Sequence, residues 1–150
     1  MAMEIARGNT RTVLIFKNFV LKFPRFYLSN AMEARRTFCK DPEKMRRHVK
    51  RHLLRGVGDN WREFIFYFCN HSSFLMPTFF SFFGLLNIQK RGEIFEMHYR
   101  VLWEQILQLT NNEAWADYHV FSEVNNFCQK DGRLKIFDYG SVEKICRRDL

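Results

Sequence analysis

The sequence has few of the features that mark secreted, zinc-bound or multidomain proteins. Its four cysteines show no Cys-x-x-Cys spacing, which leaves little support for a zinc site. No apolar run follows Met1, and Glu4 and Arg7 interrupt any signal-peptide pattern. Internal repeats, low-complexity stretches and interdomain linkers are also missing. We therefore expect a single domain in a reducing cytoplasm, with free and mostly buried thiols.

Charged residues are missing from residues 64–88, a stretch long enough to raise the question of a membrane span. Polar residues 70–73 interrupt this stretch near one end, and Pro77 interrupts it near the middle. Each of these polar groups would need a hydrogen-bonding partner in lipid. Two buried elements joined by a polar loop explain the pattern better, and we expect no membrane partner.

The composition is that of a globular protein, with 47% hydrophobic and 27% charged residues in a chain of 150. Phenylalanine is the exception, because it occurs 17 times. So many rings either fill a bulky core or leave some rings on the surface for a partner to cover.

The net charge is +8, and the excess is concentrated in residues 44–55. This segment has helical composition, with Met45, Val49, His52 and Leu53 spaced to form an inward face. The outward face would carry the basic residues Lys44, Arg46, Arg47, Lys50, Arg51 and Arg55. Such a face could bind nucleic-acid backbone or an acidic protein surface, or it could be a solvated flank, and the sequence leaves these readings open.

Apolar spacing and turn residues divide the chain into hairpins and helices. Hairpins are expected at residues 12–23 and 74–90, the second turning near Phe83-Gly84. Asp41 is the expected N-cap of a helix that starts at Pro42. The full set of expected helices covers residues 30–40, residues 42 to about 56–58, residues 61–69 and residues 93–109.

The segment from Asn126 to Gly140 combines an Asn, a short apolar strand, an Asp-Gly turn, a second apolar strand and Asp138-Tyr-Gly. This order is similar to the metal-binding end of protein kinases, where an Asn and an Asp on either side of one hairpin hold metal ions. Upstream, Lys22 lies in a Val-Leu-Lys context that resembles the Val-Ala-Ile-Lys strand of the family. The chain thus resembles a minimal, degenerate protein-kinase-like protein of the type found in phages and mobile elements.

The resemblance implies an α+β fold, with an antiparallel sheet from two hairpins, a small helical lobe and a C-terminal metal-end hairpin. Residues 1–150 would form one domain, with a sheet lobe at about residues 10–90 and a reduced helical lobe at about 91–150. Lys22 and Glu33 would bind the nucleotide, and Asp138 and Asn126 would hold magnesium. Asn125 is an open alternative to Asn126, because a register change of one residue exchanges the side chain that faces the cleft.

Departures from the kinase pattern argue against turnover. No Gly-x-Gly-x-x-Gly precedes Lys22, and the position of the catalytic Asp, five residues before Asn126, is Phe121. The residues after Gly140 leave no room for an activation segment. A bulged loop around His119 would be needed for a base to reach the vacant position, and the candidates are Asp117 and Glu123.

The predicted function is a catalytically silent kinase-like module that docks on a protein or nucleoprotein partner, in conflict between a mobile element and its host. One alternative is a minimal phosphotransferase that uses ATP and magnesium. Another is a nucleic-acid-binding protein that uses the basic residues 44–55. The sequence does not decide whether the chain is an enzyme, what its partner is or how many copies associate.

Overall fold

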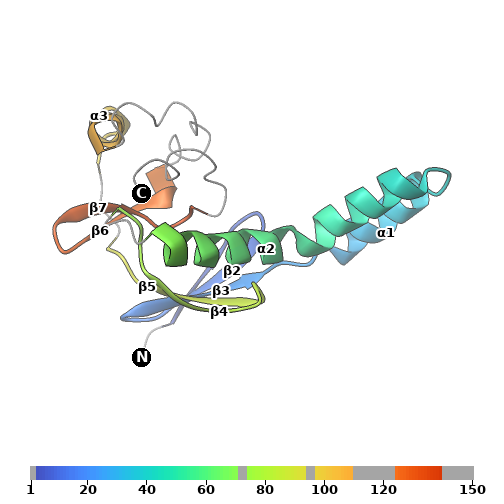
Figure 1. Ribbon diagram of the computed structural model, residues 1–150, viewed down its shortest axis with the longest axis horizontal. Helices are drawn as coiled ribbons and strands as arrows, with labels where there is room; N and C mark the ends of the chain where they lie inside the picture. Colours follow the sequence, from blue (N-terminus) through green and yellow to red (C-terminus); the bar gives the residue numbers. More distant parts are fainter. Residues whose placement is uncertain (1–2, 71–73, 94–96, 110–123, 140–150) are drawn as a thin grey trace.

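The computed structural model describes residues 3–70, 74–93, 97–109 and 124–139, which form an α+β fold (Figure 1). The main sheet has five strands: β1 (Glu4–Arg7), β2 (Arg11–Ile15), β3 (Phe19–Pro24), β4 (Thr78–Phe82) and β5 (Leu86–Lys90). Neighbouring strands are antiparallel, in the order β1-β2-β3-β5-β4. The predicted α+β class and both predicted hairpins are confirmed. Strand β1 was not predicted.

The C-terminal part of the described chain is a smaller unit built on one hairpin. Its elements are α3 (Tyr99–Leu109), the 3-10 helix η2 (Val124–Asn126), β6 (Phe127–Lys130) and β7 (Arg133–Ile136). Asp131 and Gly132 join β6 to β7 with φ angles of 53° and 72°, as the two-residue Asp-Gly turn requires. The buried apolar cluster of this unit consists of Leu75, Leu102, Ile106, Phe127, Ile136 and Tyr139.

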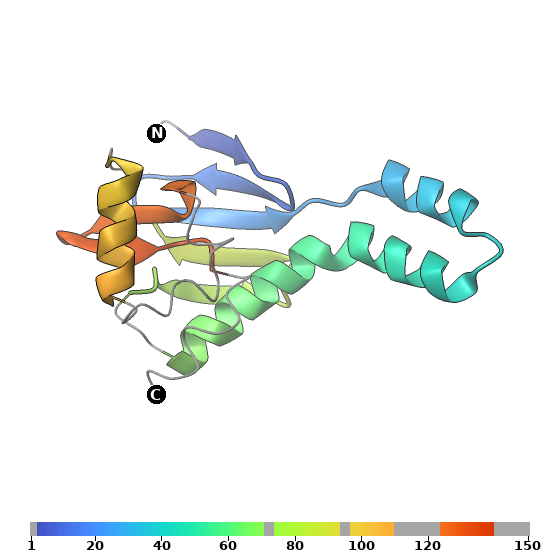
Figure 2. The same ribbon diagram turned by 90° about the horizontal axis from the view of Figure 1, so that it is seen from above.

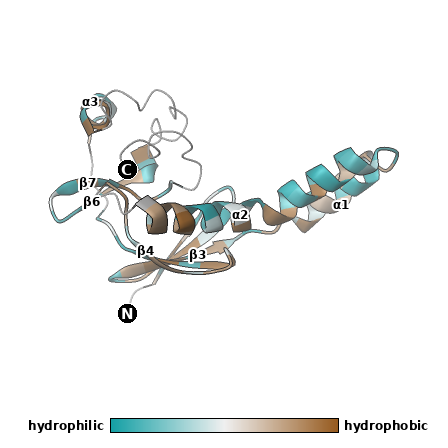
Figure 3. Cartoon of the chain, in the orientation of Figure 1, coloured by the Kyte–Doolittle hydropathy of each residue, from teal (hydrophilic) through white to brown (hydrophobic). Residues whose placement is uncertain are grey.

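Helices α1 (Leu28–Thr37) and α2 (Pro42–Asn70) form an arm that extends beyond the sheet (Figure 2). The interface within the arm is thin, because α1 buries only Ala31 and Ala34. The second half of α2 then leaves the arm and packs on β3, β4 and β5. Colouring by hydropathy shows that the outer half of α2 is largely hydrophilic, whereas the end of α2 over the sheet is more hydrophobic (Figure 3).

Helix α2 begins as predicted but does not end as predicted. Asp41 Oδ1 accepts a hydrogen bond from Lys44 N at 3.0 Å, so Asp41 caps the helix. The predicted break at residues 56–58 is wrong, because the helix continues through both glycines. A Cβ atom on Gly56 would lie 2.3 Å from Thr10 O, whereas a Cβ atom on Gly58 would meet nothing within 4 Å. Gly56 therefore marks a close approach of the helix to the β1–β2 loop, and not a helix end.

These two glycines predict opposite effects of the same substitution. Gly58→Ala is expected to raise the free energy of unfolding by about 0.5–1 kcal/mol, because alanine loses less backbone entropy in a helix. Gly56→Ala is expected to lower it by about 1–3 kcal/mol, because the added methyl group meets backbone that cannot move aside. Urea unfolding followed by circular dichroism measures both values. Stabilisation by both substitutions would contradict the close approach at Gly56.

The two faces of the main sheet differ in chemistry. Because side chains alternate along a strand, the register places Arg11, Lys22 and Gln89 on one face. The opposite face carries Ile5, Leu14, Leu21, Phe23, Phe80, Phe82, Leu86 and Ile88, and we call these residues the open sheet face. Helix α2 covers the first face, and no described helix or strand covers the open sheet face (Figure 1).

The uncharged stretch 64–88 is divided between the end of α2, the hairpin β4–β5 and the segment between them. Within the described residues, no helix has both the length and the apolar character needed to cross a bilayer. The expectation of mostly buried thiols is wrong for the described cysteines, because Cys39 and Cys69 are exposed and Cys128 is buried.

Candidate functional site

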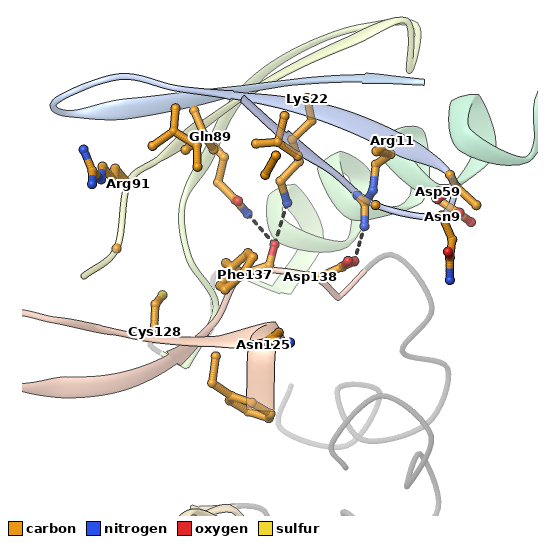
Figure 4. Close-up of a pocket in the computed structure, with 18 of the residues that line it drawn as sticks. Asn9, Arg11, Lys22, Asp59, Gln89, Arg91, Asn125, Cys128, Phe137 and Asp138 are labelled. Atoms are coloured by element: carbon orange, nitrogen blue, oxygen red, sulfur yellow. Dashed lines mark hydrogen bonds and ion pairs between the residues drawn. The ribbon is translucent and has the colours of Figure 1, made fainter. Parts of the chain in front are cut away.

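A cavity of about 500 Å³ lies between the main sheet and the β6–β7 hairpin, and we call it the cleft (Figure 4). Its volume is in the range of small-molecule binding sites. Alternating residues of β1, β2 and β3 form one wall, because that face of the sheet turns inward. The cationic residues of the lining are Arg11, Lys22, Arg55, Lys90 and Arg91, and the acidic residues are Glu4, Asp59 and Asp138. Cations therefore outnumber carboxylates around the cleft.

Lys22 of β3 lies in the cleft, where it was expected, and is only 2% exposed. Its Nζ forms an ion pair with Glu63 Oε1 at 2.5 Å and donates a hydrogen bond to Phe137 O at 2.6 Å. Burial lowers the pKa of Lys22, and the attraction of Glu63 offsets only part of this effect. The ammonium group is thus held by oxygen atoms from the helix and from the C-terminal segment.

The acidic partner of Lys22 is Glu63, and the expected pair with Glu33 is wrong. Glu33 is exposed on α1 in the arm. The prediction failed because it assumed that the first helix after β3 packs on the sheet, whereas the second helix does so. Glu63 is fully buried and accepts hydrogen bonds from Lys22, from Gln89 Nε2 at 2.9 Å and from Arg11.

Arg11 at the start of β2 joins the two carboxylates of the site. Its guanidinium binds Glu63 through Nη1 and Asp138 through Nη2, and Nη1 lies 3.4 Å from Asn60 Oδ1. Burial acts to lower the pKa of Arg11, but Glu63 and Asp138 outweigh burial and raise it. The side chain is therefore a fixed positive charge at the centre of the network.

Asp138 follows β7 and lies at the cleft end of this network, facing Arg11 (Figure 4). Its side chain is 41% exposed. Burial acts to raise the pKa of Asp138, but Arg11 and Lys22 outweigh it and hold the pKa below its ordinary value. Lys22 and Asp138 are thus brought together through Arg11 and Glu63.

The lowered pKa of Asp138 predicts a contribution to stability that acid removes. Above about pH 5 the carboxylate is ionised in the folded and the unfolded chain, so the contribution is complete. As the pH falls, the unfolded chain takes up the proton first, and the contribution is lost as the pH passes through the folded-state pKa. Asp138→Asn is therefore expected to flatten the fall in melting temperature between pH 5 and pH 3. An unchanged slope in this variant would argue against the ion pair.

The donors around Asp138 do not fit a magnesium ion. Magnesium needs octahedral oxygen ligands, and Asp138 Oδ1 is already bound by a guanidinium. In the described part of the chain, no three His, Cys, Asp or Glu side chains are grouped to hold a metal. The expected second ligand, Asn126, is not among the residues that line the cleft, and its neighbour Asn125 lines it instead. Both asparagines belong to the 3-10 helix η2, so the strand register that left the choice open does not apply to them.

Gln89 on β5 has an unpaired acceptor inside the buried network. Its side chain is fully buried, and its Nε2 donates to oxygen atoms of Glu63, Thr78 and Phe137. Its Oε1 is buried and has no hydrogen-bonding partner within the described residues. A buried acceptor of this kind is satisfied when a ligand supplies an N–H or O–H donor.

Sequence reasoning missed Arg11, Glu63 and Gln89, the residues that complete the network. A signal existed for Glu63, because it is the last charged residue before the uncharged stretch 64–88. No comparable signal marked Arg11 or Gln89, since a charged or amide residue at a strand end is ordinarily solvated.

The six basic residues predicted as a binding surface are exposed on α2: Lys44, Arg46, Arg47, Lys50, Arg51 and Arg55. Lys44 forms an ion pair with Asp41 at 3.4 Å, and Arg55 also lines the cleft. The candidate bases Asp117 and Glu123, together with His119 and Phe121, lie outside the described residues.

Comparison with known proteins finds no matching family model, no matching curated sequence and no matching solved structure. The interpretation of the cleft therefore depends on the residues of this chain.

Proposed function

We propose that this protein is a kinase-like binding module that works without phosphoryl transfer and docks on a protein or nucleoprotein partner. Protein kinases pair a Lys on their third strand with a Glu of the following helical region, and an Asp after the catalytic loop holds the metal. The ion pair between Lys22 on β3 and Glu63 on α2 supports the kinase-like part of the proposal, as does the place of Asp138 after the β6–β7 hairpin.

The observation that carries the proposal is the guanidinium of Arg11 on the carboxylate of Asp138. Kinase chemistry needs this carboxylate for a metal ion that neutralises charge on the transferred phosphoryl group. Here the carboxylate neutralises Arg11, which also binds Glu63. A magnesium ion would have to displace an internal cation that is itself buried and doubly paired, and such pairs are costly to break.

The cleft can hold a phosphate group without a metal ion. Arginine and lysine make charge-assisted hydrogen bonds to phosphate, and both Arg11 and Lys22 line the cleft. A nucleotide held directly by the protein fits this set of groups, with its phosphate bound by the N–H donors of Arg11 that Glu63 and Asp138 do not use.

Isothermal titration of ATP in magnesium and in EDTA tests this function. We expect dissociation constants that agree within about twofold, because Arg11 supplies the positive charge that a metal would supply. We also expect no transfer of radiolabelled phosphate to the protein or to a host extract. Transfer that Asp138→Ala abolishes would overturn the proposal.

Docking on a partner is supported by the open sheet face. Ile5, Phe80 and Phe82 on this face are 55%, 47% and 52% exposed, and the only charged residues on the same side of the strands are Arg7 and Lys90. A continuous apolar surface of this kind on a small protein marks an interaction site. We infer that an apolar surface of a partner protein covers it.

The triple variant Ile5→Thr/Phe80→Thr/Phe82→Thr tests the docking surface, because threonine keeps strand propensity while removing apolar area. It is expected to lose a partner captured by crosslinking, while Leu28→Thr/Met32→Thr on the arm keeps it. Leu28 and Met32 are the matched control, since they are 64% and 59% exposed. Light scattering tests the opposing outcome. If the wild type is a dimer and the triple variant is a monomer, the open sheet face binds a second copy of the chain.

A minimal phosphotransferase is the second candidate, because the pair of Lys22 and Glu63 is one that active kinases need. It requires Arg11 to leave Asp138 when the nucleotide arrives with magnesium. The ATP titration separates the two candidates, since this mechanism predicts binding at least about tenfold tighter in magnesium than in EDTA.

A further inference from the structure

Three arginines of α2 form a row that points toward the cleft. Arg47, Arg51 and Arg55 are exposed and follow each other at intervals of four residues, so they lie on one side of the helix. Each interval advances about 6 Å along the axis. None of the three forms an ion pair with any described residue. Like charges at this spacing repel, so the row is unfavourable until an anion neutralises it.

A second, smaller cavity of about 110 Å³ lies where this row meets the sheet, and we call it the basic pocket. Arg51, His52 and Arg55 line it from α2, and Arg25 and Tyr27 line it from the segment between β3 and α1. Arg25 is held in place, because it donates a hydrogen bond to Gly8 O at 2.9 Å and lies 5.1 Å from the centre of the Tyr27 ring. Among the described residues, the lining includes three arginines and no carboxylate.

The basic pocket and the cleft share part of their walls. Asn9, Thr10 and Arg55 line both cavities. Asn9 lies at the end of the cleft next to Arg11 (Figure 4). The two cavities are therefore neighbours, and a ligand with one phosphate near Arg11 would reach the basic pocket past Asn9 and Arg55.

We propose that the cleft and the arginine row bind the end of a single-stranded nucleic acid. The terminal nucleotide occupies the cleft, the adjoining phosphate occupies the basic pocket, and the following phosphates lie along Arg51 and Arg47. This inference rests on the proposed function for its first nucleotide alone. A phosphodiester strand fits better than an acidic peptide, because it combines regularly spaced phosphates, which arginine binds through two hydrogen bonds, with a base for the 500 Å³ cavity.

Fluorescence anisotropy with 3′-labelled oligothymidylates of two, six and twelve nucleotides tests the inference. Binding is expected to tighten with length, and Arg47→Gln/Arg51→Gln is expected to weaken the twelve-nucleotide strand at least about tenfold. The slope of log Kd against log salt should fall by about 1.4, because each lost phosphate contact on a single strand contributes about 0.7. Both substituted residues lie outside the cleft lining, so binding of a mononucleotide should not change.

Arg35→Gln/Arg36→Gln on α1 is the matched control, since it removes the same charge from exposed positions outside the basic pocket. Its effect on the twelve-nucleotide strand is expected to be less than about threefold. An equal loss in both double variants would overturn the inference, as would equally tight binding of polyglutamate of the same charge.

Failure of the proposed function can be told apart from failure of this inference. If a mononucleotide binds and oligonucleotides bind no more tightly than it does, the role of the arginine row is rejected and the cleft assignment stands. If oligonucleotides bind through Arg47 and Arg51 but no mononucleotide binds, the cleft assignment is rejected and the arginine row is supported.

Discussion

Glu63→Gln is expected to lower the free energy of unfolding by about 3–5 kcal/mol, a large part of the stability of a small domain. Glu63 is fully buried, and its two oxygens receive donors from Lys22, Gln89 and Arg11. An amide replaces one of these acceptors with a donor and removes the charge that compensates two buried cations. Denaturant unfolding followed by tryptophan fluorescence measures the loss.

The control for this prediction is Glu104→Gln on α3. Glu104 has a 61% exposed side chain and an ion pair with Arg100 at 3.5 Å, so its loss is expected to cost no more than about 0.5 kcal/mol. Adding Lys22→Met to Glu63→Gln removes one of the stranded cations. The double variant should therefore be more stable than the sum of the single effects by about 1–3 kcal/mol. A Glu63→Gln protein within 1 kcal/mol of wild type would show that the network does not hold the site together.

Arg11→Gln is expected to convert the cleft from metal-independent to metal-dependent binding. The substitution frees Asp138, while Glu63 keeps its ion pair with Lys22. The freed carboxylate can then serve as a magnesium ligand together with the phosphates of the nucleotide. ATP should bind this variant at least about tenfold more tightly in magnesium than in EDTA, as measured by calorimetry.

Arg91→Gln is the matched control for Arg11→Gln, because Arg91 lines the same cleft and its Nη1 donates to the backbone oxygen of Phe16 at 3.1 Å. It removes the same charge without freeing a carboxylate, so magnesium should have no effect on its affinity for ATP. Binding by Arg11→Gln that is equally strong with and without magnesium would show that Asp138 is not a latent metal ligand.

Local patterns were enough to predict most elements of the fold. Alternating apolar residues indicated the strands, Asp41-Pro42 indicated the start of α2, and Asp131-Gly132 indicated the turn between β6 and β7. Each of these patterns depends only on residues that are close together in the sequence, so the sequence is enough to recognise it. The predicted break in α2 is wrong because Gly56 is needed for close packing against Thr10 O, an atom that is far away in the sequence but adjacent in space.

The candidate site divides in the same way. Lys22 was predicted from the order of motifs that resembles protein kinases. Asp138 also stood out because it follows an apolar strand directly. The acidic partner of Lys22 is Glu63 and not Glu33 because α2, and not α1, packs on the sheet. That choice is made by tertiary packing, which sequence spacing does not reveal.

The sequence by itself determined the described strands other than β1, the basic segment and the two charged residues Lys22 and Asp138. Only the tertiary structure decided that Arg11 lies on Asp138. The residue that the sequence predicted as a metal ligand is therefore one half of an internal ion pair. The physical reason is that charge pairing depends on distance in space, and these two residues are separated by 127 positions in the chain.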